Sequence, residues 1–258
     1  MQRIRIRYAK RGPLRFTSHR DFARAFERAL RRANVPIAFS QGFTPHPKVS
    51  YASAAPTGVA SEAEYLEIGL QAEVDPQALI TALDAALSPG LDILDAVVAH
   101  GGNLAERIEA SHWRVELPDL PMADLDAAVT KFMAADEVLV ERLTKQGMRT
   151  FDTRAAVIRM AIARAETIES AALPGVAPGG YAILDLVVRL VSPTVRPDDV
   201  LSGLRVVAAL ELPTPPRATR MAQGVLTASG DFVDPLAADR DGDGALNIII
   251  GAPPTAAG

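Results

Sequence analysis

The order in which strand-like and helix-like patterns follow one another most constrains how this chain can fold. The clearest pattern is a helix after Ser18, an N-cap residue with Asp21 three positions on, and from Phe22 apolar side chains recur at the spacing of one helix face. Residues 3–8 alternate between polar and apolar side chains, as in a strand with one buried face. With the patterns that follow up to residue 99, the predicted order is β-α-β-β-α-β, which is the order of a ferredoxin-like unit.

A similar order follows the polar joint at residues 100–103. Further strand-like or helix-like patterns lie at 113–117, 123–135, 138–143, 155–165, 181–191, 198–210 and 217–226, and a loop rich in Pro and Gly lies at 166–180. We therefore expect an α+β fold of two tandem ferredoxin-like βαββαβ units with antiparallel sheets, plus a flexible C-terminal tail. The expected parts are a basic N-terminal domain at 1–102, a second domain at 103–227 and a largely mobile tail at 228–258.

The charge is divided unevenly along the chain. Twelve of the 27 Lys and Arg residues lie in the first fifty residues, which hold only two acidic residues and so carry a net charge of +10. The remaining residues carry −14, so the formal net charge of −4 conceals a strongly basic N-terminal part. Such asymmetry suggests an anionic partner for the basic part.

Composition excludes several classes of protein. With 48% apolar and 22% charged residues, the chain has the composition of an ordinary globular protein. Because it has no cysteine, we expect no disulfide, no Cys-ligated zinc and no iron–sulfur cluster, and we expect no cofactor. The apolar runs are far shorter than the roughly 18–20 residues of a transmembrane helix, and no signal-peptide pattern opens the sequence, so we expect a cytoplasmic protein without a membrane partner.

Arginines on two predicted elements form the first candidate site. The candidate phosphate ligands are Arg3, Arg5, Arg7, Arg20, Arg24 and Arg28. The first three share one face of the first strand, and the last three follow one another at four-residue spacing along the helix. Guanidinium groups pair with phosphates through two hydrogen bonds, so these side chains suit the backbone of RNA. The two groups would lie on opposite sides of the unit, and an ordinary solvated surface is the alternative.

The segment 40–48 is the second candidate site, because a glycine and two prolines fix an irregular backbone there. The residues expected to recognise RNA in this loop are Ser40, Gln41, Gly42 and Phe43. The candidate catalytic residues are His19, His46 and Lys48. Two imidazoles and a lysine can act as the base, the acid and the charge-stabilising group of a metal-independent ribonuclease. Capping and packing roles for the two histidines are the alternative.

An acidic stretch near the C-terminal end resembles the start of a calcium-binding loop. Asp239, Asp241, Asp243 and Gly244 match the D-x-D-x-D-G opening of such a loop. Ile250 stands at the twelfth position, where the loop needs a bidentate glutamate. We therefore predict an acidic turn and no metal site.

Residues 3 to about 70 resemble a known family. The matching segments are RIRYAKRG at 5–12, LRFTSHRD at 14–21, ERALRRA at 27–33, SQGFTPHPK at 40–48 and GVASEAEY at 58–65. They resemble the bacterial family of uncharacterised radical-SAM-linked proteins, from whose pattern Thr17 and Arg20 depart. The resemblance implies a radical SAM protein as a partner and supplies no catalytic residues, because the family has no established activity. The order of elements is also similar to that of the tandem ferredoxin-like RNA-processing proteins of CRISPR systems.

These features predict a non-catalytic RNA-binding or substrate-presenting accessory protein, which acts with a radical SAM enzyme or in RNA or ribosome metabolism. Two alternatives stay open. One is a metal-independent endoribonuclease that uses His19, His46 and Lys48. The other is a protein-interaction adaptor whose arginines bind an acidic protein partner.

Overall fold

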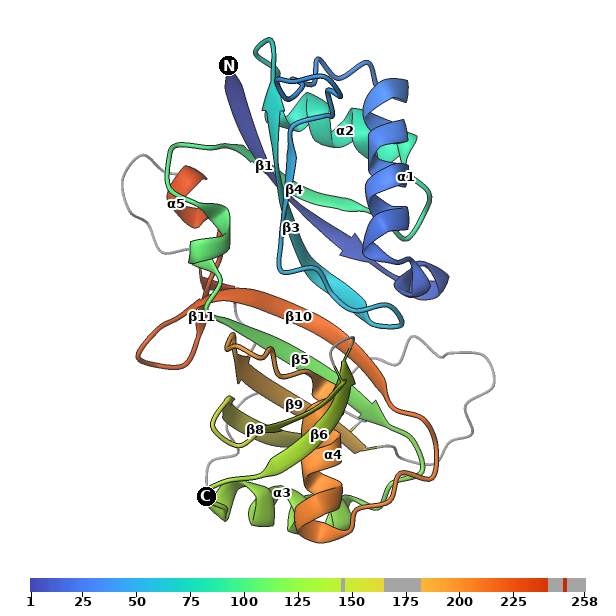
Figure 1. The fold of residues 1–258 in the computed structure, drawn as a ribbon, viewed down its shortest axis with the longest axis vertical. Helices are drawn as coiled ribbons and strands as arrows, with labels where there is room; N and C mark the ends of the chain where they lie inside the picture. Colours follow the sequence, from blue (N-terminus) through green and yellow to red (C-terminus); the bar gives the residue numbers. More distant parts are fainter. Residues whose placement is uncertain (145–146, 165–181, 241–247, 250–258) are drawn as a thin grey trace. The chain divides into compact units, whose positions relative to one another are not determined.

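The computed structural model describes residues 1–144, 147–164, 182–240 and 248–249 (Figure 1). The chain divides into two compact units: unit 1 comprises residues 1–109 and 220–251, and unit 2 comprises residues 110–219 and 252–258. Two segments far apart in the sequence therefore form unit 1. The predicted loop at 166–180 lies outside the described residues. None of the helices within the described ranges is long and apolar enough to cross a membrane.

Unit 1 is built on antiparallel strands. They are β1 (Gln2–Lys10), β2 (Val49–Ala52), β3 (Ala60–Leu70), β4 (Ile93–Val98) and the part of β10 (Arg217–Leu226) that starts at Arg220. β1 lies between β3 and β4 and is antiparallel to both, and β2 is antiparallel to β3. The helices are α1 (His19–Arg32) and α2 (Pro76–Ala86), so the order up to β4 is β-α-β-β-α-β, as the sequence predicts.

Two helices cover one face of this sheet. The Ser18 side chain caps α1 by accepting a hydrogen bond from the Asp21 N–H at 3.2 Å, as the sequence pattern predicts. Phe22 and Phe26 of α1 are buried in one core cluster with the apolar residues of β1. The rings of Tyr8 and Phe22 stack with their centroids 4.2 Å apart. The apolar face of β1 therefore points at the helices, and its arginine-bearing face points to the other side of the sheet.

Residues from the C-terminal part of the chain cover the arginine-bearing face. They include β11 (Phe232–Val233), which pairs with β10 and β12 (Ile248–Ile249), and α5 (Ala237–Arg240). Leu236 is fully buried in a cluster with Tyr65 and with Leu104 of the 3-10 helix η2 (Leu104–Arg107). The sequence predicts a mobile tail from residue 228, whereas residues 232–240 form β11 and α5 and bury Leu236 and Asp239, because their partners on the sheet lie far away in the sequence. Beyond residue 240, the structure describes residues 248–249 of that tail.

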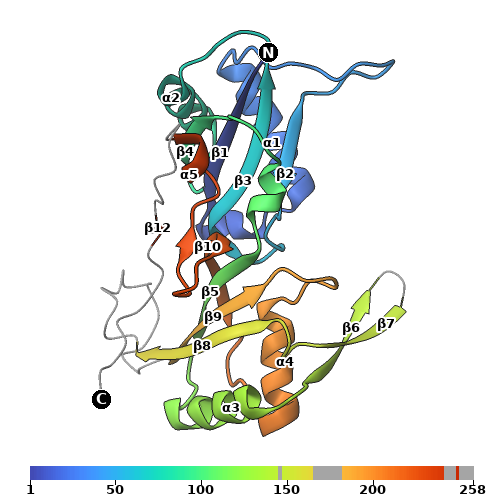
Figure 2. The same cartoon turned by 90° about the vertical axis from the view of Figure 1, so that its left-hand side faces the viewer.

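The described part of unit 2 combines three antiparallel strands, two helices and a hairpin. The strands lie in the order β5 (Ala110–Leu117), β9 (Ala182–Arg189) and β8 (Val157–Arg164). The helices α3 (Met122–Ala134) and α4 (Pro197–Ala208) approach closely at Gly203, where a Cβ atom would lie 2.7 Å from Cε2 of Phe132. The hairpin is formed by β6 (Leu139–Thr144) and β7 (Gly147–Asp152), which make up a two-stranded sheet of their own (Figure 2).

The hairpin makes unit 2 different from a plain repeat of unit 1. The sequence predicts a second β-α-β-β-α-β unit, whereas the observed order is β5-α3-β6-β7-β8-β9-α4-β10. β7 escapes prediction because four of its residues, 147–150, are exposed and carry no alternation of apolar and polar side chains. The structure thus shows an α+β protein in which the predicted order of elements is found up to β4 and does not recur unchanged in unit 2.

Candidate nucleic-acid interface

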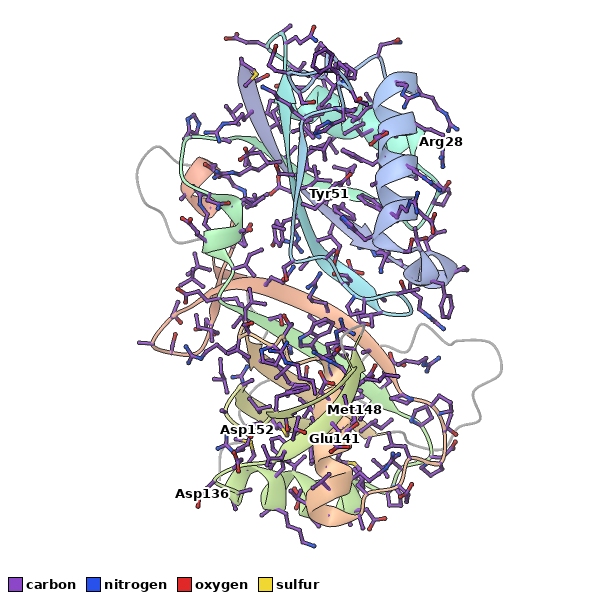
Figure 3. All side chains as sticks on the ribbon, in the orientation of Figure 1. Arg28, Tyr51, Asp136, Glu141, Met148 and Asp152 are labelled. Carbon is purple, nitrogen blue, oxygen red and sulfur yellow. The ribbon has the colours of Figure 1, made fainter. Side chains whose placement is uncertain are left out.

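The exposed side of α1 carries most of the basic charge that stays accessible in unit 1. The exposed arginines of this helix are Arg20, Arg24, Arg28, Arg31 and Arg32. Arg28 projects from α1 away from the sheet (Figure 3). With Asp21 and Glu27 as the only acidic residues of the helix, its net charge is +3. We call these five arginines, together with Arg15 and Phe16, the α1 surface.

Few of these charges are neutralised. Arg24 lies 4.0 Å from Asp21 and Arg31 lies 3.7 Å from Glu27, and both pairs are widely exposed to water. Exposed pairs of this kind contribute little binding energy, about 0–1 kcal/mol, so they leave the arginines available to another anion. For Arg20 and Arg28, no ion pair occurs among the residues that the structure describes.

An exposed aromatic ring adjoins the start of α1, and the sequence analysis did not single it out. Phe16 ends the 3-10 helix η1 (Gly12–Phe16), two residues before the cap of α1, and is 59% exposed. The guanidinium carbon of Arg15 lies 4.7 Å from the centroid of this ring. A basic group stacked on an exposed ring is typical of sites that hold an unpaired base. A single exposed aromatic residue forms no periodic pattern, so the sequence does not indicate that Phe16 belongs to a binding site.

The strand arginines differ from the helix arginines in their surroundings. Arg5 is fully buried: its Nε donates to Glu67, its Nη1 to Asp239 at 2.7 Å and its Nη2 to the carbonyls of Gly101 and Gly102. A phosphate cannot reach this guanidinium, so the proposed interface excludes Arg5.

The other two strand arginines, Arg3 and Arg7, also form hydrogen bonds within the protein. Arg7 donates from its Nε to the carbonyl of Glu62 at 3.0 Å. Arg3 is 43% exposed and donates to Glu67 at 3.2 Å. Both lie on the sheet face opposite α1, so one RNA segment bound along α1 would not contact them. The interface is therefore confined to the helix side.

The structure does not bring the three candidate catalytic residues together. His19 is exposed at the start of α1 and meets Tyr51 edge-on, with the ring centroids 4.7 Å apart. His46 Nδ1 lies 2.9 Å from Oγ of Ser40, and Lys48 Nζ lies 3.7 Å from Sδ of Met1. Each side chain thus has a different neighbour. Two imidazoles that cleave RNA must flank one phosphate, and the described contacts give no such arrangement.

The 40–48 loop is closed by its own hydrogen bonds. Ser40 N–H donates to the His46 carbonyl at 2.8 Å, and Oγ of Ser40 accepts from the His46 N–H at 3.1 Å. Gln41, Gly42 and Phe43 lie at the exposed tip. The loop follows α1 in the chain and extends from unit 1 (Figure 2), so its tip is accessible to a ligand. Recognition of RNA by this loop stays a prediction.

A buried cluster of charges on the arginine-bearing face of the sheet was not predicted. Asp239 accepts from Arg5, from Arg107 at 2.6 Å and from the His100 N–H at 2.9 Å. Burial alone would raise the pKa of this carboxyl, yet the His100 N–H and the two guanidinium groups hold the pKa of Asp239 below its ordinary value. We call Arg5, Glu67, Arg107 and Asp239 the Arg5 cluster.

The Arg5 cluster contains Asp239, the first residue of the calcium-loop-like stretch. Asp239 faces two arginines, so it is not available to a cation. The described residues contain no group of three or more His, Asp or Glu side chains arranged to hold a metal ion. Asp241, Asp243, Gly244 and Ile250 lie outside the described residues.

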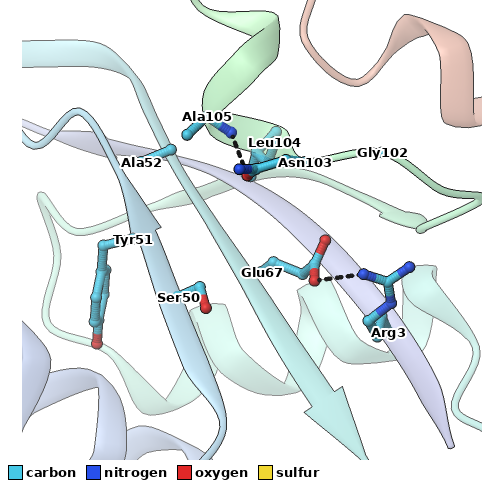
Figure 4. A pocket seen from close by; sticks show the side chains of 9 residues that line it. All are labelled: Arg3, Ser50, Tyr51, Ala52, Glu67, Gly102, Asn103, Leu104 and Ala105. Carbon is cyan, nitrogen blue, oxygen red and sulfur yellow. Dashed lines mark hydrogen bonds and ion pairs between the residues drawn. The ribbon is translucent and has the colours of Figure 1, made fainter.

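A pocket of about 250 Å³ lies beside the Arg5 cluster (Figure 4). Its strand side is formed by β1, β2 and β3, and its other side by the segment that leads into η2. The residues that line it are Arg3, Ser50, Tyr51, Ala52, Glu67, Gly102, Asn103, Leu104 and Ala105. This pocket was not predicted, because its residues come from four separate segments.

The fold and these surfaces define an α+β protein with an exposed basic helix and a small charged pocket in its first unit. The chain belongs to a family described as an uncharacterised protein conserved in bacteria (DUF2344), which matches residues 3–197. The matched region contains the α1 surface and the pocket, but not Asp239. No functionally curated protein matches the chain.

Proposed function

We propose that this protein is a non-catalytic RNA-binding protein whose interface is the α1 surface. The observation that carries the proposal is the accessible charge of α1, which remains at +3 while the buried strand arginine Arg5 is neutralised within the fold. An RNA backbone supplies the regular negative charges that such a helix face attracts.

The spacing of the arginines fits an extended anionic chain. Arg20, Arg24, Arg28 and Arg32 follow one another at four-residue intervals, which corresponds to about 6 Å of rise along a helix at each step. Each guanidinium can donate two hydrogen bonds to one phosphate. Phe16 at the N-terminal end of this row would stack on one unpaired base, which favours single-stranded RNA or a loop.

The proposal includes no cleavage step, because His19 and His46 share no neighbour. It includes a partner of one class: the resemblance to radical-SAM-linked proteins suggests that the bound RNA is presented to a radical SAM enzyme. We further infer that unit 1, with β1 between β3 and β4 and β2 beside β3, is a ferredoxin-like unit. By its order of elements, unit 2 would be a second such unit interrupted by the β6–β7 hairpin.

The test compares two triple variants that remove the same charge. Arg20, Arg24 and Arg28 are changed to Gln in one variant, and the exposed arginines Arg149, Arg189 and Arg205 of unit 2 are changed to Gln in the other. Affinity for a single-stranded RNA is measured at a series of salt concentrations. For the α1 variant we expect weaker binding and a slope of log affinity against log salt that is smaller by about 2, since each phosphate contact on a single strand contributes about 0.7. The unit 2 variant should bind like the wild-type protein.

Equal losses in both variants would show a general charge effect and contradict the proposal. The same samples, kept in EDTA, report on cleavage, and shortened RNA that disappears on His19→Ala or His46→Ala substitution would overturn the non-catalytic assignment. Recovery of an acidic protein after nuclease treatment, without measurable RNA affinity, would favour the adaptor instead.

A further inference from the structure

We propose that the pocket of unit 1 binds a small organic anion that carries a hydroxyl or amino group next to its anionic group. The pocket lies on the sheet face opposite α1, because Arg3 and Glu67 alternate with the β1 and β3 residues that face the helices. This site is therefore separate from the proposed RNA interface and does not depend on it.

Arg3 supplies the anion-binding group. Its guanidinium has five N–H donors, and the described contacts use one of them, on Glu67. Glu67 also accepts from the fully buried Arg5 at 2.8 Å, so one negative charge is shared between two positive ones. The Arg3 side chain, 43% exposed, therefore remains attractive to a carboxylate or a phosphate in the pocket.

Lys48 adds positive charge near the same place. Its side chain passes over Gly69, which pairs with Arg3 across the sheet, and its Nζ reaches Met1, two residues before Arg3. No ion pair of Lys48 occurs within the described ranges. The sequence predicts a catalytic role for Lys48, but its position in the structure suits a second cation that attracts an anion to the pocket.

Two further groups select what is attached to the anion. The Glu67 carboxylate has acceptor capacity left after its two bonds to arginine, and the Ser50 hydroxyl can both donate and accept. Ser50 and Glu67 are directly paired across β2 and β3. A ligand hydroxyl or amino group beside the anionic group would donate to Glu67, so the pocket favours a hydroxy acid, an amino acid or a sugar phosphate over a bare anion.

The size of the pocket restricts the ligand. Its 250 Å³ is below the range of about 300–1,000 Å³ that is usual for drug-sized ligands, so a compact molecule is required. Ala52, Leu104 and Ala105 form a small apolar wall against which a short carbon chain can lie. A polynucleotide does not fit such a space.

The walls of the pocket are fixed before a ligand arrives. Arg5 donates to the carbonyls of Gly101 and Gly102, so it ties the segment before η2 to the strands. Arg107 at the end of η2 is held by Asp239, and Asn103 accepts from the Ala105 N–H at 3.1 Å. Preorganised walls reduce the ordering cost of binding, which is what a small ligand with few contacts needs.

Isothermal titration and ligand-observed NMR on the full chain can test the proposal with three probes. Ribose 5-phosphate represents the phosphate class, D-glycerate represents the carboxylate class, and ribose is the neutral control. We expect one of the two anions to bind and ribose not to bind. Arg3→Met should weaken that binding at least tenfold, whereas Arg28→Met, which removes the same group on the opposite face, should leave it unchanged.

A second variant blocks the space without altering the charge. Ala105 is exposed at the rim, and Ala105→Trp should abolish binding of the anion while RNA affinity stays at the wild-type value. Thermal unfolding of each variant reports whether it is folded. The proposal is overturned if neither anion binds better than ribose, or if binding persists in Ala105→Trp. If the wild-type protein binds the anion but not RNA, the result counts against the α1 interface alone.

Discussion

At the scale of the residue, burial decides what an arginine does. Arg5 and Arg28 are the same side chain in the same basic segment, yet one is fully buried and the other is exposed. Removing a guanidinium and a carboxylate from water costs several kcal/mol for each ion, so the Arg5–Asp239 pair persists only because further hydrogen bonds satisfy both groups. Arg5 therefore holds unit 1 together, whereas Arg28 is free to hold a ligand.

Asp239→Asn should destabilise unit 1 strongly. The substitution leaves the buried Arg5 guanidinium without its full counter-charge, which typically costs about 3–5 kcal/mol. Urea unfolding followed by circular dichroism measures the change in the free energy of unfolding. Asp136→Asn removes an exposed carboxyl and is the control, for which we expect a change within about 0.5 kcal/mol. Equal stability of the two variants would show that the Arg5 cluster contributes little.

Acid should weaken unit 1 through the same carboxyl. The pKa of Asp239 is lower in the folded protein than its ordinary value, chiefly because the His100 N–H and two guanidinium groups overcome the effect of burial. A group of this kind stabilises the fold fully above its unfolded pKa and loses that contribution as the pH falls through its folded pKa. The stability difference between the wild-type protein and Asp239→Asn should therefore shrink below about pH 4, which urea titrations at stepwise pH would detect. A difference that stays constant down to pH 2 contradicts this assignment.

At the scale of the element, local signals and distant contacts differ in what they allow one to predict. α1 was predictable, because its cap and its apolar face are encoded within fifteen consecutive residues. The burial of Arg5 was not, because its partner Asp239 lies 234 positions further along the chain. β7 lacks an apolar alternation, and the pocket is assembled from four segments that carry no shared pattern. Contacts between residues far apart in the sequence, and not local secondary-structure propensity, determine the burial of Arg5, the strand β7 and the pocket.

The contact between α3 and α4 depends on the absence of a side chain. A Cβ atom at Gly203 would lie 2.7 Å from Phe132 and 3.0 Å from Oγ1 of Thr153, so Gly203→Ala should force the helices apart. Overpacking of this kind costs about 1–3 kcal/mol, measurable by thermal or urea unfolding. Ser202→Ala on the exposed side of α4 is the control and should change stability little. A Gly203→Ala variant as stable as the control would show that α4 can move without cost.

At the scale of the whole molecule, unit 1 is discontinuous in sequence. Its first part ends at residue 109 and its second begins at residue 220, with most of unit 2 encoded between them. The buried residues Leu236 and Asp239 belong to the second part. The boundaries expected from the sequence, with a tail set apart from residue 228, missed this because linear patterns do not reveal which unit a late segment completes.

Removal of residues 228–258, most of which belong to unit 1, should therefore affect unit 1 more strongly than unit 2. The deletion uncovers Arg5 and the apolar side chains of β3 that Leu236 covers. In hydrogen exchange we expect the amides of β1 and β3 to lose protection, while those of β5 and β9 keep it and serve as the internal control. Unchanged protection in β1 and β3 would show that the C-terminal segment only rests on the sheet.

During translation, Arg5 is synthesised long before its partner Asp239. A ribosome that adds about 5–20 residues per second needs roughly 10–50 seconds to travel the 234 positions between the two partners. During this interval the strands of unit 1 can pair and α1 can dock, but Glu67 is the acidic partner that Arg5 has until Asp239 is added. Arg5 thus gains its second acidic partner, Asp239, only after 234 further residues have been synthesised, whereas Glu67 is available much earlier.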